Sequence, residues 1–149
     1  TGTHTYNHPD YGDLSADFGT SFYNWSALPN KATALNEEMQ EVNYHAAVAV
    51  NMNFGPYSSG AYLNDACNAL TQYFNYNTTI FEAIKNEWDN ENDWVNMLKS
   101  EIDNGRPVIY AGYNTTGRSG HAFVCDGYTN DYFHFNWGWS GYADGNFLL

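Results

Sequence analysis

The stretch that decides the fold lies in the last third of this 149-residue chain, where residues 119–127 read SGHAFVCDG and residues 136–141 read NWGWSG. Around it, short runs rich in apolar and aromatic residues at 108–113, 122–128 and 132–136 are interpreted with a period of two. A period of two is typical of β-strands, and the turn residues at 129–131 predict an antiparallel hairpin between the last two runs. Residues 114–120 are the expected loop before it, and residues 146–149 begin another strand.

The part of the chain that precedes these strands has a helical period instead. Apolar residues recur at steps of three and four, as Leu35 and Met39 do, in segments that predict helices over 31–50, from Ser58 or Ser59 to about residue 73, and over 92–104. Asn30 is the expected N-cap of the first helix, and Gly105 is expected to end the third.

The first 30 residues are rich in Gly, Asn, Asp, Pro and aromatic side chains and predict extended segments and turns. Residues 18–25 are expected to form a strand or an ordered arm. Helices followed by antiparallel strands indicate the α+β class. The length and the apolar fraction of 43% predict a single domain, or most of one, over residues 1–149.

Composition excludes several classes of function. The net charge of −12 repels the phosphates of nucleic acid. The sequence has no apolar run of 18 residues and therefore no expected membrane span. It has no phosphate loop and no dinucleotide fingerprint, and His4, His8 and His45 make no metal-ligand set with each other or with a cysteine. No cofactor and no metal are therefore expected.

His121 opens one β-like run and is the first candidate for chemistry. A neutral imidazole acts as a base when its second nitrogen is held, and the side-chain oxygen of Asn136 could accept that N–H. The ring of Trp137 could shield the pair from water. The alternatives are a structural histidine and an aromatic turn that packs the core. His134, two residues before Asn136, is either a second site histidine or part of an aromatic ladder.

Neither cysteine is a convincing nucleophile for this base. Cys67 lies in the middle of an expected helix, whereas a catalytic thiolate prefers a helix N-terminus, where the dipole lowers the pKa. Cys125 follows His121 by four residues in one strand, too far along it for a hydrogen bond. Both cysteines are expected to be buried free thiols, although a disulfide between them is an alternative.

Three motifs together resemble the streptopain family of papain-like cysteine peptidases, which includes interpain-like and periodontain-like enzymes. Residues 120–127 read GHAFVCDG, residues 133–141 read FHFNWGWSG with Asp-Gly at 144–145, and residues 48–60 read VAVNMNFGPYSSG. The resemblance covers most of the chain from about residue 18. The Asn-Trp-Gly-Trp run favours this family over other papain-like hydrolases, such as bacteriocin-processing peptidases and cell-wall amidases, which also place a histidine at a strand start.

The resemblance implies an incomplete papain-like fold, a cysteine endopeptidase activity, and a role for each matching residue. His121 would be the catalytic general base, with Asn136 and Trp137 as its orienting and shielding neighbours in the catalytic site. Substrate-binding positions would be Gly120, as a backbone contact, and Ser58, Ser59 and Gly60, in a loop that lines the cleft.

The same resemblance places the nucleophilic cysteine and an oxyanion-hole glutamine before Thr1, and further strands after Leu149. The chain is therefore expected to be a partial peptidase domain, inactive alone. Its expected partners are protein or peptide substrates, the N-terminal segment with the cysteine, and an inhibitory propeptide. The expected location is the bacterial cell surface or outside the cell, which low lysine and abundant Asn, Tyr and Gly also favour.

Two other functions are compatible with the same residues. An inactive homologue could bind peptides or sugars through its many Tyr and Trp side chains, which number 13 and 5. A structural or adhesin domain would have its His121 and Asn136 side chains beyond hydrogen-bond reach, with no cleft beside them.

Overall fold

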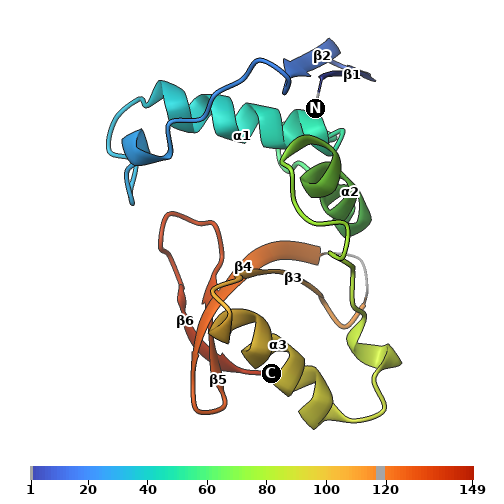
Figure 1. Ribbon diagram of the computed structural model, residues 1–149, viewed down its shortest axis with the longest axis vertical. Helices are drawn as coiled ribbons and strands as arrows, with labels where there is room; N and C mark the ends of the chain where they lie inside the picture. The colour runs from blue at the N-terminus through green and yellow to red at the C-terminus, as the bar shows by residue number, and fades with distance from the viewer. Residues whose placement is uncertain (1, 117–119) are drawn as a thin grey trace. The chain divides into compact units, whose positions relative to one another are not determined.

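The computed structural model describes residues 2–116 and 120–149, and it divides the chain into two compact units (Figure 1). Unit 1 is Thr1–Ala83 and unit 2 is Ile84–Leu149. Part of the loop predicted at 114–120 lies outside the described residues.

Unit 1 begins with a β-hairpin that the sequence predicted only as extended segments and turns. Strand β1 (Thr3–His8) pairs antiparallel with β2 (Gly12–Asp17). Gly12 closes the turn with a φ of 70°, a left-handed conformation that glycine adopts without strain. Of the strand or ordered arm expected over residues 18–25, the strand is wrong. Phe18 is buried as the chain leaves β2, and the segment continues without strand pairing into a 3-10 turn, η1 (Trp25–Ala27).

The first helix, α1 (Glu37–Ala49), begins six residues after the predicted start. Asn36, not Asn30, is the N-cap, because its Oδ1 accepts the backbone N–H of Met39 at 2.8 Å. Leu35 therefore lies outside the helix, and its side chain is 90% exposed instead of facing the core.

The second helix, α2 (Leu63–Tyr73), also begins later than predicted. Tyr62 is its N-cap residue and makes no side-chain cap, so the prediction that Ser58 or Ser59 caps it is wrong. Asn53 and Gly60 exchange two backbone hydrogen bonds instead, which closes residues 53–60 into a loop. The core of unit 1 lies where α1 packs on the hairpin and on α2, and consists of Ala16, Phe18, Val48, Ala49 and Ala69.

Unit 2 contains one long helix and a four-stranded sheet. After the 3-10 turn η2 (Lys85–Glu87), helix α3 (Glu91–Asp103) begins at the N-cap Asn90 and ends before Gly105, whose φ of 69° suits the end of a helix. The strands are β3 (Val108–Tyr113), β4 (Gly120–Thr129), β5 (Tyr132–Asn136) and β6 (Gly145–Leu148), each antiparallel to the next. Helix α3 and the four strands lie within two residues of their predicted bounds, whereas η2 was not predicted.

The two faces of this sheet differ in burial. Helix α3 lies along one of them, here called the inner face (Figure 1). The inner face carries the buried side chains of Phe123, Cys125, Phe133 and Phe135, which share the core of unit 2 with Trp94 and Leu98 of α3. The outer face carries the alternate residues, such as Ile109 and Val124, which are more exposed.

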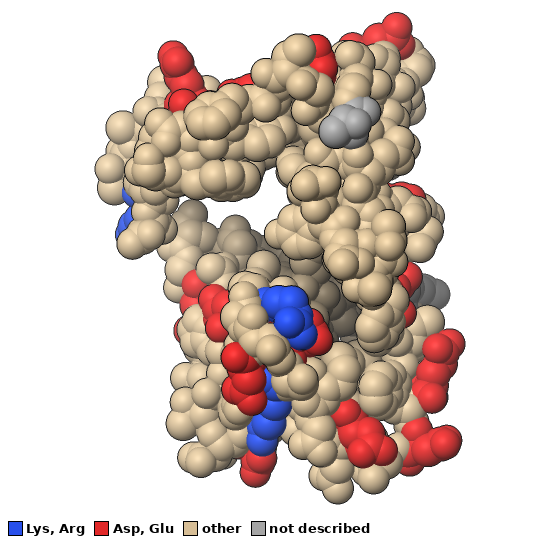
Figure 2. Space-filling model, in the orientation of Figure 1, with Lys and Arg blue, Asp and Glu red and all other residues tan. Residues whose placement is uncertain are grey.

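The described elements thus confirm the α+β class, with three helices followed by an antiparallel sheet, and add the hairpin before them. Figure 2 shows acidic side chains spread over the visible face of both units, with few basic ones among them, as the net charge of −12 requires. None of the described helices is long and apolar enough to cross a membrane.

Candidate active site

His121 is the second residue of β4 and lies on the inner face of the sheet. It pairs with Gly112 of β3, and its side chain shares a face with Phe123 and Cys125. Those two neighbours are buried, whereas His121 is only half-buried. The strand start therefore presents an imidazole at the border between the core of unit 2 and solvent.

A backbone carbonyl holds one nitrogen of this imidazole. His121 Nε2 lies 2.8 Å from the carbonyl oxygen of Trp137. A carbonyl oxygen only accepts hydrogen bonds, so Nε2 must carry the proton. In the neutral ring Nδ1 is then a free acceptor, which is the state that a general base requires.

Aromatic rings surround the same imidazole. The ring of Trp139 stacks on it at a centroid distance of 4.7 Å, and those of Phe123 and Trp137 lie at 6.0 and 6.2 Å. Trp137 also contacts Phe123 at 4.3 Å, which joins the cluster to the core of the sheet. The rings limit the access of water to the hydrogen bond and restrict rotation of the imidazole.

Asn136 lies near His121 in the sheet but is not the hydrogen-bond partner of its imidazole. It pairs with Val124 of β4 and therefore belongs to the outer face. Its Oδ1 accepts the backbone N–H of Gly138 at 2.9 Å, whereas the sequence suggested the imidazole as its partner. The peptide group that donates this N–H is the one whose carbonyl, on Trp137, accepts from His121. Asn136 thus fixes the acceptor of the imidazole, and its catalytic role stays a prediction.

Gly120 comes directly before His121 but belongs to the outer face, opposite Tyr113. A Cβ atom at this position would lie 2.7 Å from the Tyr113 ring. The space left by the missing side chain is thus covered by an aromatic ring that is itself 75% exposed. A substrate contact at Gly120 remains a prediction, and it would have to come from the inner face or follow a movement of Tyr113.

The other predicted substrate residues are together in unit 1. Ser58, Ser59 and Gly60 lie in the exposed loop at 53–60, where Ser59 Oγ accepts the backbone N–H of Gly55 at 3.4 Å. Beside them, the side chain of Tyr57 is fully exposed. This loop is accessible at residues 56–60, and its role in lining a cleft stays a prediction.

The two cysteines have the properties of inert thiols. Cys125 is fully buried, and desolvation raises the pKa of its thiol to about 11. Cys67 is the fifth residue of α2, and burial followed by the charge of Glu82 raises its pKa as well. Both remain protonated near pH 7, so neither provides a nucleophilic thiolate.

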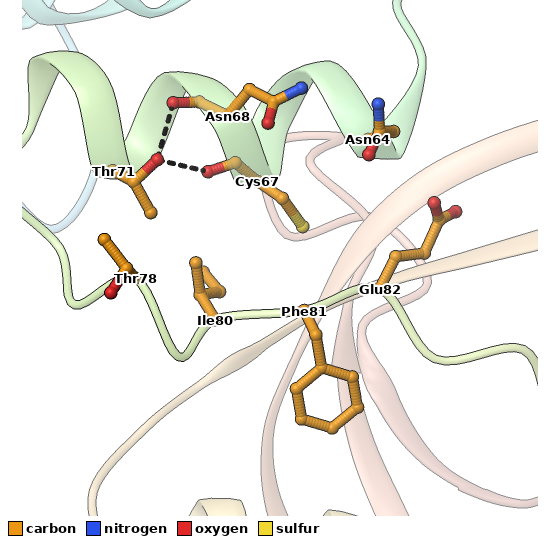
Figure 3. A pocket seen from close by; sticks show the side chains of 8 residues that line it. All are labelled: Asn64, Cys67, Asn68, Thr71, Thr78, Ile80, Phe81 and Glu82. Carbon is orange, nitrogen blue, oxygen red and sulfur yellow. Dashed lines mark hydrogen bonds between the residues drawn. The ribbon is translucent and has the colours of Figure 1, made fainter.

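A shallow hollow of about 440 Å³ lies beside Cys67 in unit 1. Figure 3 shows the Cys67 sulfur directed toward the segment that carries Phe81 and Glu82, while Thr71 donates to backbone carbonyls of α2. The wall is mostly polar, and the carboxylate of Glu82 in it raises the pKa of the thiol, which disfavours a thiolate. Within the described parts of the chain, no three His, Cys, Asp or Glu side chains converge in a way that could bind a metal ion.

His134, the second candidate histidine, lies on the outer face and has a carboxylate as its partner. A β-bulge between Cys125 and Gly127 brings Asp126 beside it, and His134 Nδ1 lies 2.5 Å from Asp126 Oδ1. Both side chains are 38% exposed. Because it is on the other face, His134 takes no part in the cluster around His121.

Two residues that contact this cluster were not predicted from the sequence. Trp139 stacks on His121, and Asp144 accepts the backbone N–H of Trp137 at 2.9 Å through Oδ1. Both belong to the stretch from Asn136 to Gly145 that the motif already included. The second tryptophan of this stretch and the Asp-Gly pair at the end of the stretch are the sequence signals that could have indicated these two residues.

Comparison with known proteins places this chain in a family. Residues 1–147 match the Peptidase C10 family. The chain is 38% identical over 159 residues to the thiol protease/hemagglutinin PrtT of Porphyromonas gingivalis, covering all of this chain and 17% of that protein. It is 33% identical over 154 residues to streptopain of Streptococcus pyogenes, covering 97% of this chain and 36% of that protein. The chain thus spans about a sixth to about a third of these relatives.

Proposed function

The chain belongs to the Peptidase C10 family, and from that premise we propose that it supplies the imidazole side of a cysteine endopeptidase site. The observation that carries the proposal is the hydrogen bond from His121 Nε2 to the Trp137 carbonyl. It fixes the tautomer in which Nδ1 can take a proton from a thiol. The fold in this proposal is papain-like, as the family implies.

In the proposed reaction, a cysteine of the full-length protein other than Cys67 and Cys125 donates its thiol proton to His121 Nδ1. The thiolate attacks the peptide carbonyl carbon, and the imidazolium returns the proton to the leaving amine as the C–N bond breaks. Water then attacks the thioester while Nδ1 takes a proton from it. Cleavage of the C–S bond releases the acid and restores the thiolate–imidazolium pair.

The residues around His121 favour this cycle without touching the peptide bond. The Trp137 carbonyl stabilises the imidazolium, because it accepts Nε2–H in both protonation states. Asn136 holds that carbonyl through Gly138 N–H, and the Trp137 and Trp139 rings keep water from it. Gly120 and the loop at 58–60 are the proposed substrate contacts.

The wider setting is proposed from the family. Substrates are proteins or peptides, an inhibitory propeptide is an expected partner, and the protein acts outside the cell or on its surface. Immunoblots of culture supernatant and washed cells would test the location, and retention of the protein inside the cells would contradict it.

The test uses the full-length protein that carries these residues. A thiol-directed epoxide should abolish cleavage of a denatured protein substrate. His121→Ala should lower kcat/KM by at least about 1,000-fold, since removing the base of such a pair disables the nucleophile. The matched control is His134→Ala, which removes a histidine from the same sheet and should retain activity within about threefold. Turnover that survives His121→Ala would overturn the proposal.

A second candidate is an inactive homologue that binds peptides or sugars. It is favoured by exposed aromatic rings in the segment after β5, where Trp139 is 49% and Tyr142 is 76% exposed. It predicts no cleavage and no labelling by the epoxide, together with quenching of tryptophan fluorescence when a ligand is added. Epoxide labelling of the full-length protein would exclude it.

A further inference from the structure

We propose that Asp144 is a positioning residue, whose carboxylate fixes Trp137 and thereby the carbonyl that orients His121. This inference rests on the proposed function and adds to it a group outside the set of His121, Asn136 and Trp137. The carboxylate does not need to touch the substrate. It acts through the backbone of Trp137, on which the tautomer of the imidazole depends.

The first observation is that both peptide groups of Trp137 are held by side chains. Asp144 Oδ1 accepts the Trp137 N–H at 2.9 Å, which fixes the peptide before the residue. Asn136 Oδ1 accepts the Gly138 N–H at 2.9 Å, which fixes the peptide after it. The carbonyl that receives His121 Nε2 lies between these two bonds, so its direction is set from both sides.

The second observation is that the loop between these residues is conformationally costly. Gly138, Ser140, Gly141 and Ala143 have φ values of 75°, 54°, 86° and 63°. Ser140 and Ala143 carry a Cβ atom, for which this left-handed region is unfavourable. Such a backbone persists only where surrounding contacts determine it.

The contacts across this loop converge on its two ends. Trp137 Nε1 donates to the Ala143 carbonyl at 3.0 Å, and Tyr142 N–H donates to the Trp139 carbonyl at 3.0 Å. The bond to Asp144 is the one with a charged acceptor, and charge-assisted bonds are the stronger kind. Without it, the Trp137 peptide loses its fixed direction, and the Trp139 ring loses its fixed place over His121.

Three substitutions separate the possible roles of the carboxylate. Asp144→Asn keeps an oxygen acceptor in place and removes the charge. Asp144→Glu keeps the charge and moves the acceptor by one methylene. Asp144→Ala removes the charge and the acceptor together. The control is Asp89→Ala, an exposed acid of unit 2 outside the site. Circular dichroism establishes that each variant is folded.

In the full-length protein, we expect kcat to fall about 10- to 100-fold in Asp144→Ala and Asp144→Glu, with KM changed less than about threefold, because a small misplacement of a reacting group has effects of this size. Asp144→Asn should stay within about threefold to fivefold of the unsubstituted protein. If the alanine variant does not fold, the kcat values of Asp144→Asn and Asp144→Glu, compared with each other, test the inference. Activity of Asp144→Glu equal to or above that of Asp144→Asn would overturn the inference, as would an Asp144→Ala variant equal to Asp89→Ala.

The outcome separates this inference from the proposed function. If His121→Ala abolishes turnover and Asp144→Ala does not reduce it, only the positioning role fails. If His121→Ala retains turnover, the proposed function fails. A readout without turnover is the ¹⁵N spectrum of the imidazole in the 149-residue chain. Asp144→Ala should convert His121 from the pure Nε2–H tautomer to a mixture, and an unchanged spectrum would contradict the inference.

Discussion

The inner and outer faces of the β3–β6 sheet each present a histidine, in two different settings. On the inner face, His121 donates to a backbone carbonyl and lies among three aromatic rings. On the outer face, His134 is paired with the carboxylate of Asp126, and both are open to solvent. A backbone acceptor within a rigid aromatic cluster holds an imidazole without adding a charge, whereas an exposed ion pair is screened and contributes little.

The two faces should differ most in how far truncation of a large side chain lowers the free energy of unfolding. Phe133 on the inner face is fully buried, so Phe133→Ala should lower the free energy of unfolding by about 3–5 kcal/mol. Ile109 on the outer face is 46% exposed, and Ile109→Ala should cost less than about 2 kcal/mol. Urea unfolding of the two variants measures both values. Equal losses would mean that the outer face is covered as well as the inner one.

The buried thiol of the inner face should make stability depend on pH in the alkaline range. The pKa of Cys125 is raised to about 11 in the folded state, whereas an unfolded thiol titrates near 9.0. The contribution of this group is therefore fully present below about pH 9 and is lost as the pH rises toward about 11. The Cys125→Ala variant should show a smaller alkaline loss of stability in urea unfolding. In the Cys67→Ala control, the alkaline loss of stability that comes from Cys125 should remain. A pH profile of stability that Cys125→Ala leaves unchanged would contradict the burial of the Cys125 thiol.

The ion pair of the outer face should have the smallest effect. Asp126→Asn removes the charge of the partner of His134, and exposed pairs of this kind contribute about 0–1 kcal/mol. Thermal unfolding should therefore shift by only a few degrees, and the shift should shrink further in high salt. A loss above about 2 kcal/mol would show that the bulge at Asp126 depends on this pair and that the two faces are more alike than proposed.

Much of unit 2 could be predicted from the sequence because its signals are local and agree with one another. The run at 132–136 gave both bounds of β5, and Asn130 in the turn adopts the left-handed conformation that such a turn requires. In unit 1 the signals compete. Asn30 and Asn36 can both cap a helix, and only the tertiary fold selects Asn36. Strands β1 and β2 carry too many polar residues for a clear alternation.

For the candidate site, the sequence predicted which residues lie near one another better than it predicted their contacts. His121, Asn136 and Trp137 do lie in one continuous arrangement, but a side-chain amide was the expected acceptor, and the structure has a backbone carbonyl there. A carbonyl acceptor leaves no signature in a sequence, because every residue has one. The register of β4 and β5 excludes the Asn136 side chain as the acceptor for His121, because it places Asn136 opposite Val124 on the outer face.

The most direct test of this account is the tautomer of His121. In a ¹⁵N-histidine-labelled chain, long-range ¹H–¹⁵N spectra of the neutral imidazole, recorded at alkaline pH, distinguish the two ring nitrogens. His121→Gln identifies the signals. The account predicts that His121 carries its proton on Nε2, with His134 protonated on Nδ1 toward Asp126 as an internal comparison. A proton on Nδ1 of His121, or rapid averaging between its two nitrogens, would contradict it.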